Sequence, residues 1–270
     1  ELFLSPRITM LTEQQYLHFQ TFGFVALRQV FTSDEFKRLD AEFNSALEAA
    51  YRHAPYDGTT RHWVPMMGPS TPVFASLLED ARICEVAEQL YGEDTLGIIT
   101  DANRYVGDTR WHPDTGSIHQ FGVKFAFYLE AVGPETGALR IIPGSHKQPF
   151  HDKSKQAMPE LNMNIQDVPA YICASEPGDV FAFDLRCFHA SYGGSDDRRM
   201  CTCVYYNNPK TPAQEETTRK QAKNSAKTPT SFNRPDDPIY DPHWLANPEG
   251  SAKRQRWLDR MRELGYFEAA

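Results

Sequence analysis

The second half of the sequence is a series of short runs rich in β-branched and aromatic residues, separated by turns that contain glycine or proline. Such runs are typical of β-strands, and the turn residues allow the chain to reverse between them. The clearest predicted strands cover residues 96–100, 122–131, 138–143, 179–185 and 200–207. Because helical patterns precede these strands instead of alternating with them, we expect an antiparallel α+β arrangement. A double-sheet jelly roll is the favoured core.

The first third of the chain carries helical patterns. A capping box at Thr12 begins a predicted helix over residues 12–22. Apolar residues at three- and four-residue steps predict a second helix over residues 33–47 and a third helical region, broken in its middle, over residues 71–92. A short terminal helix is expected over residues 251–264. We expect these apolar stripes to pack on the sheet and assign them no catalytic role.

A single domain over residues 1–270 is expected, because a chain of this length can bury one sizeable core. Within it, residues 1–95 are predicted to give mostly helical support and residues 96–208 the jelly-roll core. Residues 209–237 are polar and poor in large apolar side chains, which predicts a loop. Residues 238–270 are predicted to form a C-terminal helix region.

Charge and cysteine content exclude several classes of partner. The formal net charge of −8 disfavours nucleic acid and anionic membranes, because both require a basic surface. No run of about eighteen apolar residues is present, so no membrane span is expected. Five cysteines are an odd number and contain no CxxC pair, which favours free thiols in a reducing cytoplasm. The acidic balance is otherwise uninformative about the substrate.

Two separated motifs together contain a set of metal ligands. His112 and Asp114 form a His-x-Asp tripeptide, and His189 lies far downstream. On an extended segment, side chains at positions i and i+2 point to the same face, so that the first two residues can bind one ion together. Two imidazoles and one carboxylate form the ligand set of non-haem Fe(II) oxygenases. The tripeptide alone is a weak signal in a chain with nine histidines, and the neighbouring strand-like runs strengthen it.

These motifs belong to a longer series that spans nearly the whole chain. In order, the series is Leu11-Thr12-Glu13-Gln14, Phe19, Gly23-Phe24-Val25, Val30-Phe31, Trp111-His112-Pro113-Asp114, Glu135-Thr136-Gly137-Ala138-Leu139-Arg140-Ile141-Ile142-Pro143-Gly144-Ser145-His146-Lys147, Pro177-Gly178-Asp179, His189 and Arg198-Arg199. The series resembles the phytanoyl-CoA dioxygenase-like (PhyH) branch of the Fe(II)/2-oxoglutarate oxygenases. The resemblance implies a mainly β, cupin-like double-stranded β-helix, flanked by N-terminal helices and a short C-terminal helix.

The resemblance also implies a cofactor site. His112, Asp114 and His189 are the expected ligands of Fe(II), with positions left open for 2-oxoglutarate and O2. The far carboxylate of 2-oxoglutarate needs a planar, permanently charged partner such as an arginine. Arg198 and Arg199 point to opposite faces of a strand, so only one of them faces the barrel interior. We favour Arg198, and Arg199 remains the alternative.

Three further residues resemble positions at which relatives contact 2-oxoglutarate or substrate. They are Thr100, Asn103 and Lys124, which lie on or near the predicted strands that flank the motif. A structural role is an equal alternative for each of them.

The implied reaction is oxidation, with hydroxylation favoured, of an unactivated C–H bond in a small metabolite while 2-oxoglutarate becomes succinate and CO2. Desaturation, cyclisation and demethylation remain open as outcomes. Asp114 argues against halogenation, because related halogenases have a small residue at that position. The alternatives are a cupin-type metalloenzyme that does not use 2-oxoglutarate and a non-catalytic jelly-roll binding protein. The sequence leaves substrate identity and oligomeric state open.

Overall fold

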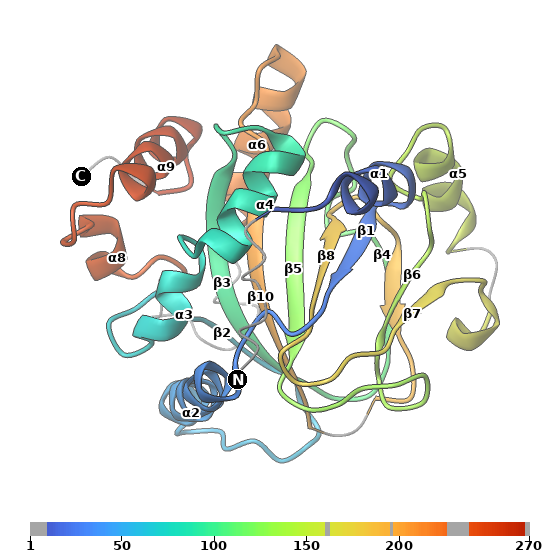
Figure 1. Cartoon of the computed structure of the whole chain (residues 1–270), viewed down its shortest axis with the longest axis horizontal. Helices are drawn as coiled ribbons and strands as arrows, with labels where there is room; N and C mark the ends of the chain where they lie inside the picture. Colours follow the sequence, from blue (N-terminus) through green and yellow to red (C-terminus); the bar gives the residue numbers. More distant parts are fainter. Residues whose placement is uncertain (1–9, 160–162, 195–196, 226–237, 268–270) are drawn as a thin grey trace, which may run out of the picture.

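The computed structural model describes residues 10–159, 163–194, 197–225 and 238–267 (Figure 1). Two antiparallel sheets form its centre. The six-stranded sheet has the order β1 (Phe24–Leu27), β8 (Val180–Asp184), β5 (Gly122–Tyr128), β10 (Arg198–Tyr206), β3 (Leu96–Tyr105) and β2 (His62–Pro65). The four-stranded sheet has the order β4 (Thr109–His112), β9 (His189–Ser191), β6 (Leu139–Ile141) and β7 (Tyr171–Cys173). This arrangement confirms the predicted jelly roll of the double-stranded β-helix type.

Most of the helices pack around the larger sheet. In chain order, the described helices are α1 (Glu13–Phe22), α2 (Ser33–Ala50), α3 (Pro72–Leu77), α4 (Ala81–Tyr91), α5 (Phe150–Ala157), the 3₁₀ turn η1 (Ile165–Asp167), α6 (Pro212–Ser225), α8 (Pro242–Ala246) and α9 (Ala252–Leu264). The predicted capping box of α1 is present, with Thr12 and Gln15 each accepting a backbone N–H of the other. Gly23 ends α1 at a φ of 84°, a conformation that glycine adopts without strain. Among the described helices, none is both long and apolar enough to cross a membrane.

Two large hydrophobic clusters fill most of the described interior, and a third, small one contains Ile142, Val168 and Phe188. The larger of the two joins the helices to the outer face of the six-stranded sheet and includes Phe43, Phe74 and Trp257. The other large cluster fills the space between the two sheets and includes Leu139 and Phe181. Leu139, Phe183 and Met200 of this cluster also form part of the wall of a cavity between the sheets.

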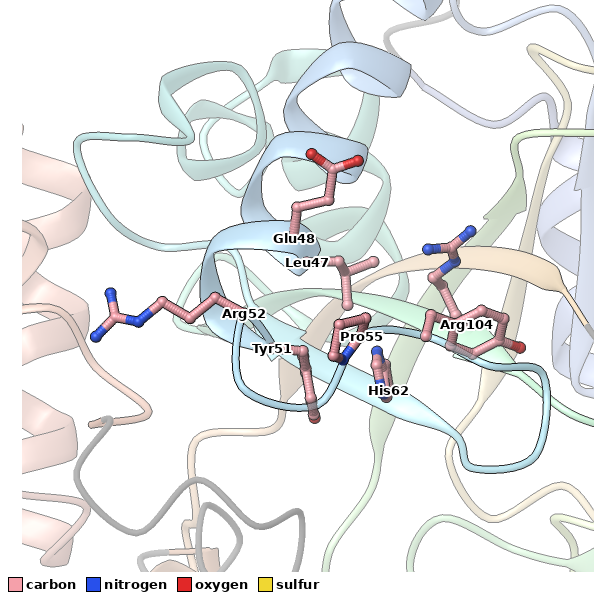
Figure 2. Close-up of a pocket in the computed structure, with 8 residues that line it drawn as sticks. Leu47, Glu48, Tyr51, Arg52, Pro55, His62 and Arg104 are labelled. Atoms are coloured by element: carbon pink, nitrogen blue, oxygen red, sulfur yellow. The ribbon is translucent and has the colours of Figure 1, made fainter.

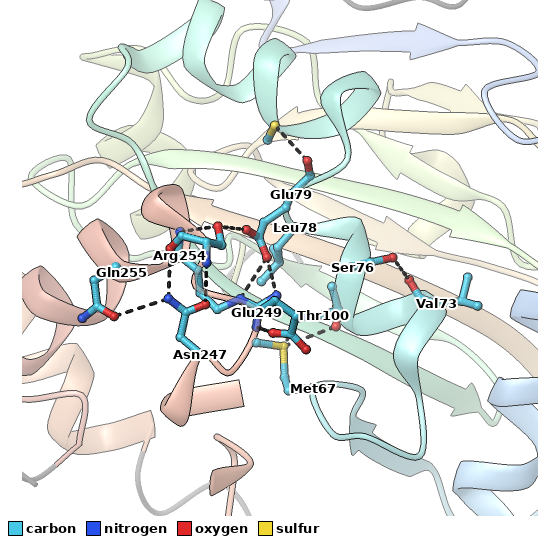
Figure 3. Close-up of polar contacts among 12 residues, drawn as sticks. Met67, Val73, Ser76, Leu78, Glu79, Thr100, Asn247, Glu249, Arg254 and Gln255 are labelled. Atoms are coloured by element: carbon cyan, nitrogen blue, oxygen red, sulfur yellow. Dashed lines mark hydrogen bonds and ion pairs between the residues drawn. The ribbon is translucent and has the colours of Figure 1, made fainter. Parts of the chain in front are cut away.

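The C-terminal helix α9 is held by packing and by ion pairs. Arg254 pairs with Glu79 at 2.5 Å and with Glu249 at 2.8 Å (Figure 3). Trp257 packs so closely on β3 that a Cβ atom at Gly97 would lie 2.7 Å from its ring. A glycine at that position allows the helix to approach the strand.

Several expectations need correction. Residues 212–225, predicted as part of a polar loop, form α6, because Ala, Gln, Glu, Lys and Arg favour helix and Glu215 pairs with Arg219 one turn later at 2.6 Å. The rest of that predicted loop, residues 226–237, lies outside the described residues. Residues 1–95, predicted to be mostly helical support, contain α1 to α4 and also contribute β1 and β2 to the two edges of the larger sheet. The strands β2, β4, β7 and β9 have three or four residues each, too few to show an alternating pattern.

One partly buried interaction between α2 and α4 gives a test of the fold. Glu35 completes the capping box of α2 with Thr32 and accepts hydrogen bonds from Arg82 on α4, one of them at 2.9 Å. Partial burial acts to raise the pKa of Glu35, but the hydrogen bonds from Arg82 and Thr32 outweigh it and lower the pKa from 4.5 to about 2.

The variant Glu35→Gln should be less stable than wild type by about 2 kcal/mol at neutral pH. Because the folded-state pKa lies below the unfolded value of 4.5, the stabilisation is present above that pH and is lost as the pH falls towards about 2. Urea unfolding at neutral pH and near pH ~3 measures the difference. Asp34→Asn, at the exposed neighbouring position, is the control and should change stability little at either pH. A Glu35→Gln deficit that does not shrink in acid would contradict the role of this carboxylate.

Candidate metal centre

The three predicted metal ligands lie together between the two sheets. His112 is the last residue of β4 and pairs in antiparallel register with His189, the first residue of β9. The imidazole centroids of these two residues are 4.3 Å apart. One potential ligand atom from each of His112, Asp114 and His189 lies within 4.8 Å of the others. Asp114 is not on the strand as predicted but in the bend that follows β4.

Hydrogen bonds fix which imidazole nitrogen of each histidine faces the centre. Nδ1 of His112 lies 2.7 Å from the carbonyl oxygen of Arg110, and Nδ1 of His189 lies 3.0 Å from that of Cys187. A carbonyl oxygen accepts only, so both Nδ1 atoms carry the proton and both Nε2 atoms present a lone pair. Metal-binding histidines commonly have this arrangement.

The two carboxylate oxygens of Asp114 contact different neighbours. Oδ2 forms an ion pair with Nζ of Lys124 at 2.9 Å, while Oδ1 lies 3.8 Å from Nε2 of His189. Burial acts to raise the pKa of Asp114, but Lys124 and His189 lower it to about 2. Burial also lowers the pKa of His189 to about 4. Both groups are therefore deprotonated at neutral pH, which is the form that binds a metal.

The two arginines lie on opposite faces of β10. Arg198 is buried in the cavity that His112, Asp114 and His189 also line, and its guanidinium lies 5.0 Å from the ring centroid of Tyr105. Arg199 faces the other way and pairs with Asp40 at 2.5 Å and with Glu130 at 3.1 Å.

Two glycines make room for the guanidinium of Arg198. A Cβ atom at Gly137 would lie 2.3 Å from Nη1 of Arg198, and one at Gly194 would lie 2.2 Å from the same atom. Gly137 also has a φ of 87°, which disfavours any other residue. A side chain at either position would therefore displace the guanidinium.

The other three residues predicted to contact 2-oxoglutarate or substrate have different surroundings in the structure. Lys124 lines the metal-centre cavity. Asn103 accepts a hydrogen bond from Arg61 and donates one to Asp101 at 2.8 Å. Thr100 is fully buried and donates to the carbonyl oxygen of Met66 at 2.9 Å, next to Met67 (Figure 3). The hydrogen bonds of Thr100 are therefore those of a core residue.

Sequence reasoning missed Asp101, Tyr105, Thr109 and Ser191. Asp101, Asn103 and Tyr105 alternate along β3, so they share the face that points between the sheets. The polar residues at alternate positions of a buried strand were the available signal. Thr109 and Ser191 pair with each other on β4 and β9, which are too short to show a pattern.

A larger cavity, of about 340 Å³, lies outside the two-sheet interior (Figure 2). Tyr51, His62 and Arg104 are among the residues that line it, and none of the predicted site residues does. The imidazole of His62 stacks on the ring of Tyr51 at 3.7 Å, and Arg104 pairs with Asp197 at 2.7 Å. Tyr51, His62 and Arg104 thus already have partners within the protein.

Comparisons with known proteins agree with this architecture. A family model described as phytanoyl-CoA dioxygenase (PhyH) matches residues 19–201, which is more than half of the chain. No curated protein sequence gives a significant match.

Three solved structures show the same fold at low sequence identity. EvdMO1 superposes with a TM-score of 0.57 at 21% identity, covering 73% of this chain, which spans 50% of EvdMO1. HygX from Streptomyces hygroscopicus, solved with nickel and 2-oxoglutarate bound, gives a TM-score of 0.57 at 22% identity, covering 73% of this chain and 88% of HygX. EctD from S. alaskensis, in its apoform, gives 0.55 at 21% identity, covering 76% of this chain and 82% of EctD.

The geometry of the centre predicts metal binding that depends on Asp114. Wild-type protein should bind one equivalent of Co(II), and Asp114→Ala should bind it at least ~100-fold more weakly, because a carboxylate ligand is lost from a set of three. Isothermal titration with Co(II) measures both affinities. His119→Ala, which removes an exposed histidine outside the cluster, should keep the wild-type affinity. If Asp114→Ala bound Co(II) as tightly as wild type does, this centre would be excluded as the metal site.

Proposed function

Because the chain belongs to the phytanoyl-CoA dioxygenase family, we propose that it is an Fe(II)- and 2-oxoglutarate-dependent oxygenase that acts on a small molecule. The observation that carries the proposal is the convergence of His112, Asp114, His189 and Arg198 on one cavity. Three of these residues form the ligand set of non-haem iron, and the fourth is a buried arginine that can pair with an anion.

The residues present fit an iron ion. His112 and His189 present Nε2 lone pairs, and Asp114 presents Oδ1 on the same side. Bound Fe(II) would supply the activation of O2, which side chains alone do not provide. Lys124 holds the far oxygen of Asp114 and so fixes the orientation of that carboxylate. The three ligands would leave open the positions that 2-oxoglutarate and O2 need.

Arg198 is the proposed anchor of 2-oxoglutarate. Its guanidinium is rigid, permanently charged and shaped to pair with a carboxylate through two hydrogen bonds. Leu139, Phe183 and Met200 line the same cavity and would exclude water around the bound cosubstrate. Asn103 and Thr100 are proposed to support this site through β3, without contact to the cosubstrate.

The proposed reaction is hydroxylation of a C–H bond, with conversion of 2-oxoglutarate to succinate and CO2. EctD, which shares the fold, has also been solved with 2-oxoglutarate and 5-hydroxyectoine, a hydroxylated small molecule. That structure supports a small-molecule substrate for this chain as well. Asp114 supports oxygenation over halogenation, because it keeps the third ligand position filled by a carboxylate.

Binding of 2-oxoglutarate tests the oxygenase proposal and separates the two arginines. Anaerobic titration of the Fe(II)-loaded protein with 2-oxoglutarate, followed by visible absorption, should show binding to wild type. Arg198→Gln should raise the dissociation constant by about 10- to 100-fold, the loss expected for charge-assisted hydrogen bonds. Arg199→Gln should stay within about twofold of wild type, because its partners Asp40 and Glu130 lie on the other face of β10.

Succinate formation provides the second readout. In air, with a panel of small metabolites, the wild-type protein should convert 2-oxoglutarate to succinate. Oxidation of a metabolite without succinate would instead favour a cupin-type enzyme that does not use 2-oxoglutarate. Iron binding with neither cosubstrate binding nor O2 consumption would favour a non-catalytic binding protein.

The close contact between Gly194 and Arg198 allows the position of the guanidinium to be tested without replacing the arginine. Gly194→Ala should weaken 2-oxoglutarate binding at least ~10-fold, because the new methyl group would clash with the guanidinium of Arg198 and with the Gly107 carbonyl oxygen that accepts its hydrogen bond, and so would displace both. Gly133→Ala is the matched control, since its Cβ would meet only Thr136 Oγ1 at 3.8 Å. The same titration measures both variants, and circular dichroism confirms folding. Wild-type affinity in Gly194→Ala would show that the position of Arg198 does not matter for the cosubstrate.

A further inference from the structure

A second cavity, of about 240 Å³, adjoins the metal centre and shares Asp114 and Lys124 with it. Its walls come from β2, β3 and β10, from α6 through Gln221, and from the segment just before α8. The lining includes three aromatic side chains, Trp63, Tyr206 and Tyr240, and the aliphatic side chains Ile98, Ile99, Leu185, Val204 and Ile239. An apolar lining with a few fixed polar groups is typical of a small-molecule site.

Asp101 is the fixed polar group of this cavity. The residue is only 9% exposed, and its Oδ1 accepts hydrogen bonds from Thr202 Oγ1 at 2.9 Å and from Asn103 Nδ2 at 2.8 Å. The indole of Trp63 donates a further hydrogen bond to the carboxylate. Because a carboxylate can accept about four hydrogen bonds, Asp101 keeps the capacity to accept one from a molecule in the cavity.

The described residues that line the cavity carry more negative than positive charge. Asp101 and Asp114 are two carboxylates, and Lys124, which pairs with Asp114 at 2.9 Å, is the one basic side chain among the described lining residues. Fe(II) and the 2-oxoglutarate dianion carry equal and opposite charges, so loading the centre leaves this balance unchanged. Burial raises the pKa of Asp101 even though the charges of Lys124 and Arg61 act to lower it, so these two cations supply less counter-charge than the buried carboxylate needs. A cation in the cavity would supply that charge.

We propose that this cavity is the substrate site of the oxygenase and that the substrate carries a protonated amine, or another compact cationic group with N–H donors, that binds Asp101. The inference rests on the function proposed above. The aromatic rings favour the same head group through cation–π attraction, and the aliphatic side chains receive the carbon skeleton. With Lys124 as its one basic side chain, the described lining disfavours phosphorylated substrates, which need several basic groups.

Binding of three probes that differ only in their head group tests the proposal. The probes are cyclohexylammonium, cyclohexanol and cyclohexanecarboxylate. The full chain is loaded with Zn(II), a redox-inert replacement for iron, and with 2-oxoglutarate, and ligand-observed NMR measures each dissociation constant. In wild type, cyclohexylammonium should bind at least ~10-fold more tightly than cyclohexanol, as expected for a hydrogen bond to a charged group. In Asp101→Asn that preference should fall to about twofold.

A matched control accounts for the change in net charge. Asp259→Asn removes one carboxylate from the exposed face of α9, lines neither cavity, and should keep the wild-type preference. Binding of 2-oxoglutarate to Asp101→Asn shows that the variant is folded. If Asp101→Asn does not fold, the comparison of the three head groups on wild type still tests whether the cavity prefers an amine.

The outcomes separate the two proposals. If wild-type protein binds neither the metal nor 2-oxoglutarate, the proposed function itself fails. If the protein loads normally but cyclohexanol or cyclohexanecarboxylate binds as well as cyclohexylammonium, or if no probe binds, the amine proposal is overturned and the oxygenase proposal stands. A preference for the amine that persists in Asp101→Asn also overturns it, because another group must then bind the cation.

Discussion

The antiparallel pairing of β4 with β9 is the interaction on which the candidate centre depends. It sets His112 directly opposite His189 and brings Asp114, two residues beyond the strand, to the same point. Neither strand is long, but β9 also pairs with β6, so His189 is held from both sides within the smaller sheet. The larger sheet then contributes Lys124 and Arg198 across the gap. The centre therefore forms only when both sheets are in place.

Burying so many charged groups between two sheets is costly, and ion pairs offset part of that cost. Lys124 and Asp114 form an ion pair, and each nevertheless lines a cavity. Arg198 differs, because its neighbours are the carbonyl oxygen of Gly107 and the ring of Tyr105. Among the described residues these neighbours of Arg198 are neutral, which suits its permanent charge to an anionic ligand, and this is the physical basis for choosing Arg198 over Arg199.

Parts of this fold were predictable because they follow from local chemistry. The capping box at Thr12 and the apolar steps of α2 specify helices without help from the rest of the chain. Likewise, the two-residue period of a strand is enough to place Arg198 and Arg199 on opposite faces. The short strands β4, β7 and β9 were not predictable, because hydrogen bonds to neighbouring strands define them. Helix α6 was missed because its buried face is small, with Thr218 and Ala222 as its fully buried side chains, and resembles a solvated segment.

The alternation along β10 explains how one strand serves both the core and the site. Its odd-numbered residues, Cys201, Cys203 and Tyr205, pack in the cluster beneath the helices. Its even-numbered residues face the space between the sheets: Arg198 and Met200 line the metal-centre cavity, Thr202 binds Asp101, and Val204 and Tyr206 line the adjoining cavity. The proposed cosubstrate anchor and the proposed substrate cavity are thus at opposite ends of one strand face, with Asp114 and Lys124 shared between them. A substrate held by Asp101 would not compete for Arg198, since Asp101 pairs with Thr202, four residues along β10 from Arg198.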